Sequence, residues 1–140
     1  MRPILAGLLL LAASVLSTPA PAQEGEDKPD PIDAALAKCL DQPDSSSTVG
    51  MVACFDTARD AWEREVVRAY TALSATLDAR SRGILRGTQK QWEAYAAGER
   101  RFQTGPWTRD RGTLIAVTIA SQNVDLFKNR ALTLRHYLAN

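Results

Sequence analysis

The longest helical pattern in the chain is STVGMVACFDTARDAWEREVVRAYTALSATL, residues 47–77. Apolar side chains recur in it at steps of three and four residues, the spacing of one face of an α-helix. They are Met51, Phe55, Ala58, Trp62, Val66, Ala69, Leu73 and Leu77, with Tyr70 beside them. Ser47 or Thr48 can cap the first turn, because either hydroxyl can accept a bond from a free backbone N–H. The pattern predicts a long amphipathic helix.

Two further patterns of similar length follow it. The first runs from about Ser81 to Phe102, and its expected inward face is Leu85, Thr88, Trp92, Tyr95, Glu99 and Phe102. The second runs from about Gly112 to Leu138, with Leu114, Val117, Ser121, Val124, Phe127, Ala131, Leu134 and Leu138 on one face. No useful length of sequence alternates with a period of two, so no sheet is expected. The sequence predicts an all-α fold, an antiparallel up-down bundle of three long helices.

A short helix precedes this bundle. Asp30-Pro31 is a good helix start, the helix is expected to end near Leu40, and residues 41–47 form a loop by composition. Cys39 and Cys54 are the only cysteines, and in an exported protein an even number predicts a disulfide. That bond would fasten the short helix to the next one. The alternative is two free or metal-binding thiols. Metal binding is disfavoured because the chain has one histidine and no Cys-x-x-Cys spacing.

The N-terminus has the pattern of an export signal. Arg2 is followed by an uncharged apolar run of 13 residues and by Ala20-Pro21-Ala22, so residues 1–22 are predicted to be a cleavable signal peptide. A retained membrane anchor is the alternative, but the run is shorter than the ~20 residues that span a bilayer. Residues 23–30 are predicted to be a disordered acidic leader and residues 31–140 the helical domain. We therefore expect a periplasmic or secreted protein without a membrane span after cleavage.

Charge and composition limit the classes of function that the chain can have. The full chain has a net charge of +1, which falls to about zero without Arg2, so no nucleic-acid partner is expected. Asp60, Glu63 and Glu65 lie off the apolar face and are interpreted as a solvated cluster, and His136 as a surface residue near a helix end. No catalytic constellation, metal-ligand set or cofactor motif stands out, so we do not expect an enzyme.

Two features could serve binding. Glu99 lies on the expected inward face of its helix, where a carboxylate needs a partner unless it sits at the edge of that face. The loop of residues 103–111 carries Trp107, with Arg100, Arg101, Arg109 and Arg111 around it. Trp and Arg are the residue types most enriched at binding hot spots. The alternative is that Trp107 folds back to cap the end of the bundle and the arginines are only solvated.

The chain resembles the LprI-type lysozyme-inhibitor family of small exported bacterial domains. The resemblance runs from about Cys39 to Leu134. It rests on Cys39, Ser47-Thr48, Gly50-Met51 and Cys54, then Trp62, Tyr70, Gln89, Trp92 and Tyr95, and finally Gly112-Thr113-Leu114, Arg130 and Leu134. It implies an envelope protein that binds and inhibits lysozyme. From the residue types, we expect the Trp107 loop with Arg101, Arg109 and Arg111 to make the contact. The alternative function is a periplasmic adaptor or structural binding module with another partner.

The resemblance also contains a departure. Members of the family commonly have a second cysteine pair, and those two positions here are Arg100 and Gln122. The resemblance thus implies that residues 100 and 122 face each other across the third and fourth helices. In that alignment Arg130 lies near Trp92, in reach of a cation–π contact, and Glu99 lies near Asn123. Loss of the pair is expected to loosen the end of the bundle that carries the Trp107 loop.

Overall fold

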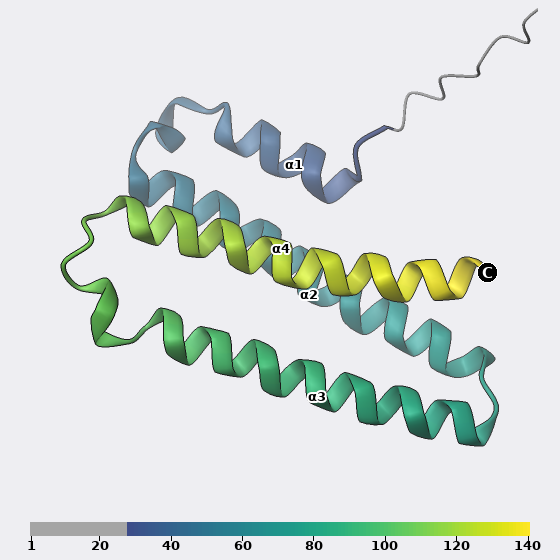
Figure 1. Ribbon diagram of the computed structural model, residues 1–140. Coiled ribbons are helices and arrows are strands. Elements are labelled where there is room, and N and C mark those ends of the chain that lie inside the picture. The colour runs from purple at the N-terminus through teal and green to yellow at the C-terminus, as the bar shows by residue number, and fades with distance from the viewer. Residues whose placement is uncertain (1–27) are drawn as a thin grey trace, which may run out of the picture.

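The computed structural model describes residues 28–140 (Figure 1). The predicted signal peptide, residues 1–22, and the first five residues of the predicted leader lie outside the described part. Within it the elements follow the predicted order: α1 (Pro31–Leu40), η1 (Pro43–Ser46), α2 (Thr48–Thr76), α3 (Ala79–Gln103), η2 (Pro106–Thr108) and α4 (Leu114–Ala139). Helices that follow one another along the chain run antiparallel, so the predicted up-down bundle is confirmed (Figure 1).

The core lies mainly between α2 and α4, which pack side by side. Five predicted positions of α2 are buried, Ala58, Trp62, Val66, Ala69 and Leu73, as are four of α4, Val124, Phe127, Ala131 and Leu134. Alanines recur on both contacting faces, and small side chains let two helix backbones approach closely. The predicted face of α4 is wrong at its ends, because Leu114 and Leu138 are exposed where the neighbouring helices no longer cover them.

The inward face of α3 differs from the prediction. Gln89 and Ala96 are its buried residues, while Leu85 and Trp92 pack partly buried against the core. Thr88, Tyr95 and Phe102, which were expected inside, are exposed. The helix is rotated by part of a turn because Gln89 finds a hydrogen-bond partner inside the bundle, so a polar residue can occupy the inward face.

Helix α1 is fastened at both ends. The predicted disulfide joins Cys39 to Cys54, with 5.7 Å between their Cα atoms, and ties the end of α1 to α2. At the other end Asp30 caps α1, accepting a bond from the Ile32 N–H, and Lys128 of α4 lies 2.7 Å from Asp33. Ile32 and Leu36 pack against the core between these two attachments. The short helix therefore lies along the α2–α4 pair.

The turn between α1 and α2 explains the motif around Gly50. Ser47 caps α2 by accepting a bond from the Gly50 N–H, as predicted for Ser47 or Thr48. A Cβ at position 50 would lie 2.2 Å from the carbonyl oxygen of Asp44, so only glycine permits this approach of η1 to α2. Ser45, buried in η1, contacts both the Cys39 carbonyl and Cys54 Sγ. The motif residues thus build the turn beside the disulfide.

Candidate functional site

A buried ionic cluster joins three helices and corrects one prediction. Glu65, expected on a solvated face with Asp60 and Glu63, is only 8% exposed. It accepts two bonds from Arg68, at 2.6 and 2.7 Å, and a third from Arg135 of α4. Asp60 is exposed and Glu63 half-buried, so the three carboxylates do not form one cluster. Glu65 lies inside because two guanidinium groups compensate its charge.

These contacts shift the titration of two carboxyl groups. Hydrogen bonds from Arg68, together with those from Arg135, outweigh burial and lower the pKa of Glu65 to about 2. Burial alone would raise the pKa of Asp30, but its bonds to Arg135 and to the Ile32 N–H lower it overall. Both groups are therefore ionised at neutral pH and hold the N-terminal end of α1 against α2 and α4.

The motif tryptophan of α2 belongs to the same assembly. Trp62 is completely buried, and the charged groups of Lys128 and Arg135 lie 5.9 and 5.3 Å from its ring. Tyr70, about two turns further along α2, is partly buried and packs against the core. Both residues therefore have structural roles, as does the disulfide.

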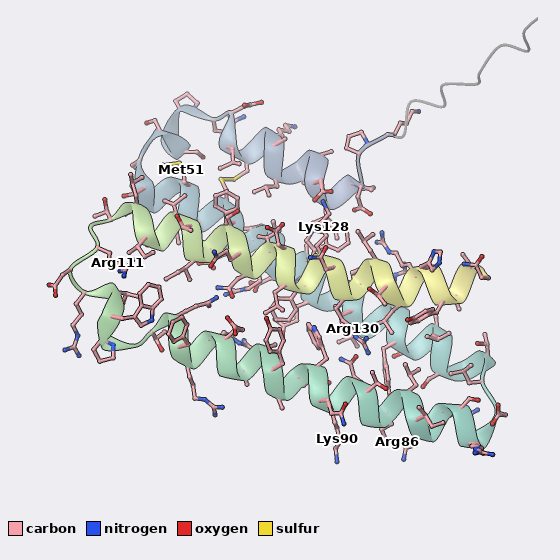
Figure 2. The ribbon with its side chains drawn as sticks, in the orientation of Figure 1. Met51, Arg86, Lys90, Arg111, Lys128 and Arg130 are labelled. Atoms are coloured by element: carbon pink, nitrogen blue, oxygen red, sulfur yellow. A yellow bond between two sulfur atoms is a disulfide. The ribbon has the colours of Figure 1, made fainter. Side chains whose placement is uncertain are left out.

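Helices α3 and α4 are linked through Arg130. Its guanidinium donates two bonds to Gln89 Oε1, at 3.0 and 2.9 Å, and lies 5.9 Å from the Trp92 ring. The predicted cation–π contact is confirmed, and Figure 2 shows Arg130 pointing from α4 towards α3. Trp92 also meets Phe127 edge to face at 5.4 Å. These contacts agree with the antiparallel alignment that the missing cysteine pair implied.

Arg100 and Gln122 occupy the two positions of the missing cysteine pair. Arg100 extends its guanidinium to 5.7 Å from the Phe127 ring, and Gln122 is exposed on α4. Glu99 is half-buried, and no ion pair of its carboxylate is found among residues 28–140. It therefore sits at the edge of the inward face, one of the two predicted possibilities. His136 is exposed near the end of α4, as expected.

The α3–α4 loop, residues 104–113, holds Trp107 in a fixed position. Its ring stacks on Phe102, with 4.8 Å between centroids and 20° between planes, and its Nε1 donates to the Phe102 carbonyl. The Arg111 guanidinium covers the ring at 5.1 Å. A Cβ at Gly105 would lie 3.2 Å from the indole, so glycine gives the ring room. Trp107 thus folds back on the end of α3, as the alternative interpretation expected.

This stack presents a compact aromatic surface with cationic surroundings. Phe102 is 61% exposed, Trp107 is half-buried, and Arg101, Arg109 and Arg111 are exposed around them. Figure 2 shows Arg111 at this end of the molecule, whereas Arg86 and Lys90 point away from the bundle along α3. Such a surface can contact apolar groups and carboxylates together. The sequence indicated Trp107 and the arginines but not Phe102, which it placed inside.

Neither a metal-ligand group nor a membrane-spanning helix is found within residues 28–140. In this part of the chain no group of three or more His, Cys, Asp or Glu residues is arranged to hold a metal ion. Its helices also include none that is both long and apolar enough to cross a membrane.

Comparisons with known proteins point to one family. A family model described as "Lysozyme inhibitor LprI" matches residues 39–134. The chain is also similar to the crystal structure of an uncharacterized protein from Burkholderia thailandensis, with 34% sequence identity and a TM-score of 0.73. That similarity covers 79% of this chain and 54% of the other, so this chain spans about half the length of its structural relative. Among curated proteins no match was found.

Proposed function

The chain belongs to the LprI family of lysozyme inhibitors, and we propose that it binds a lysozyme stoichiometrically and blocks its muramidase activity outside the cytoplasm. The family match covers most of the helical domain, including the disulfide, the buried Trp62 and the Arg130 link. Those residues build the scaffold. The inhibitory contact is assigned to the loop that the scaffold carries.

The observation that carries this assignment is the fixed aromatic stack of Phe102 and Trp107 inside a group of exposed arginines. A lysozyme cleft contains two catalytic carboxylates. Arg109 and Arg111 can reach such groups from the tip of the loop, while the two rings fill the apolar part of the cleft. Because the indole is already held by stacking and by a hydrogen bond, binding loses little side-chain entropy.

Export is part of the proposal. The disulfide between Cys39 and Cys54 is of a kind that persists in oxidising compartments, and the N-terminal sequence has the pattern of a signal peptide. A periplasmic or secreted inhibitor would meet a lysozyme before the enzyme reaches the cell wall. The protein acts by occupying the enzyme and needs no catalytic group of its own.

Loop variants of the oxidised chain 23–140 test the assignment. We expect Trp107→Ala and Arg109→Ala each to weaken inhibition of a c-type lysozyme by about tenfold, the effect of losing a hot-spot residue. Arg86→Ala is the matched control, since that arginine is exposed on α3 and points away from the bundle. Inhibition that is unchanged in both loop variants would remove the loop from the mechanism. Binding of a non-lysozyme protein without inhibition would favour an adaptor.

A further inference from the structure

A shallow groove lies directly beside the α3–α4 loop. Its lining comes from α2, the end of α3, η2 and α4 and includes Val52, Thr108, Ile115, Ala116, Ile119 and Asn123. A second groove shares Val52 and Ala116 with it and extends to Val49, which is 78% exposed. The two form one continuous depression across the starts of α2 and α4, which we call the loop-side groove. The groove exists because α3 ends at Gln103. The α3–α4 loop that follows covers the α2–α4 pair only in part.

The groove contains a buried amide with an unmet hydrogen-bonding need. Asn123 is 8% exposed, and its Oδ1 has no hydrogen-bond partner within residues 28–140. Buried amides are nearly always paired, so an unpaired one that lines a groove can accept a hydrogen bond from a group bound there. A peptide group suits it, because it offers one donor and one acceptor and can pair with the amide whichever way that amide is turned.

The rest of the lining selects against a charged occupant. Asp56 is the carboxylate at the groove, and it lies 3.2 Å from Arg59, which also pairs with Asp60. Thr108 uses its hydroxyl to bond the Gly105 carbonyl. Thr104 likewise donates its hydroxyl to backbone carbonyls of α3, and Gln103 adds an uncharged amide. The other walls are valine, isoleucine and alanine side chains. The groove therefore fits an apolar side chain followed by a free peptide group.

We propose that this groove receives an apolar side chain and its adjacent backbone from the lysozyme that the loop contacts. The inference rests on the proposed function and extends its interface. Thr108 lines the groove and stands between Trp107 and Arg109, so the groove lies within reach of a partner that contacts the loop. The loop supplies aromatic and cationic contacts, and the groove supplies an apolar pocket with one amide.

A groove-filling variant tests the proposal. Ala116 is exposed at the groove, so Ala116→Trp fills it without disturbing the core. Binding of the oxidised chain 23–140 to a c-type lysozyme is measured by calorimetry. We expect Ala116→Trp to weaken binding at least tenfold. Ala75→Trp, at an exposed alanine near the opposite end of α2, is the control and should bind within twofold of the parent chain.

A second variant separates binding from folding. Asn123→Leu removes the unpaired amide, so the melting temperature should stay the same or rise while affinity for lysozyme falls at least fivefold. Unchanged affinity in Ala116→Trp and Asn123→Leu, with the parent chain binding normally, overturns the groove and leaves the proposed function standing. Absence of binding by the parent chain overturns both. If the parent chain is a dimer, and Ala116→Trp dissociates it without weakening lysozyme binding, the groove is instead a site of self-association.

Discussion

Replacing Glu65 by Gln should remove a pH-dependent part of the stability of this fold. The pKa of Glu65 falls from 4.5 to about 2 in the folded chain, which corresponds to about 3 kcal/mol of stability above pH 4.5. Because the Arg68 side chain is 65% exposed, solvent screens part of this interaction, and we expect about 2 kcal/mol. The variant should therefore unfold about 2 kcal/mol more easily at pH 7.

The direction of the pH effect follows from the lowered pKa. Between pH 4.5 and about 2 the unfolded chain takes up a proton at Glu65 before the folded chain does, so the parent chain loses this stability as the pH falls through that window. Urea unfolding followed by circular dichroism at pH 7, 4.5, 3 and 2 measures it. Asp60→Asn is the control, because Asp60 is exposed and pairs with its neighbour Arg59. A stability gap between parent and Glu65→Gln that is as large at pH 2 as at pH 7 would refute the reasoning.

Three further predictions concern the scaffold. Gly50→Ala should lower the free energy of unfolding by about 1–3 kcal/mol, because its Cβ would meet the Asp44 carbonyl at 2.2 Å, and urea unfolding measures the loss. Gly87→Ala, where nothing but the neighbouring residues and backbone of α3 itself lies within 4 Å of the added carbon, should instead raise it by about 0.5–1 kcal/mol, and a decrease would contradict this explanation of α3. Reducing the Cys39–Cys54 disulfide, which closes a separation of 15 residues, should cost about 3 kcal/mol, and equal urea midpoints with and without reductant would contradict it.

The sequence predicted most of the framework, because long stretches with a helical period and strong caps leave little choice. The limits of α1 and α2, the disulfide and the contact between Trp92 and Arg130 all followed from spacing or from the family resemblance. The helix limits depend on local propensity, and the contact between helices depends on a register that the family's second cysteine pair fixes. Both can be predicted without knowing which polar groups are paired in the folded chain.

The errors in α2 and α3 share one physical cause, which is the pairing of a polar side chain with an arginine of another helix. Glu65 was interpreted as solvated and Gln89 was not among the expected inward residues, yet each is buried because an arginine of α4 reaches it. Since Gln89 can face inward, α3 turns and leaves Tyr95 and Phe102 exposed. The rotation of α3 also affects the candidate site, because it leaves the Phe102 ring at the surface, where Trp107 stacks on it. Such pairings join residues far apart in the chain, so a pattern within one helix does not reveal them.

The central claim is that this chain inhibits a lysozyme by binding it. The most direct measurement is a titration of the oxidised chain 23–140 against c-type lysozyme in a peptidoglycan-clearing assay, with i-type and g-type enzymes in parallel. The account predicts a saturable loss of activity that is complete near equimolar inhibitor for at least one class. Full activity of all three classes in the presence of excess chain, shown by circular dichroism and thiol titration to be folded and disulfide-bonded, would contradict it.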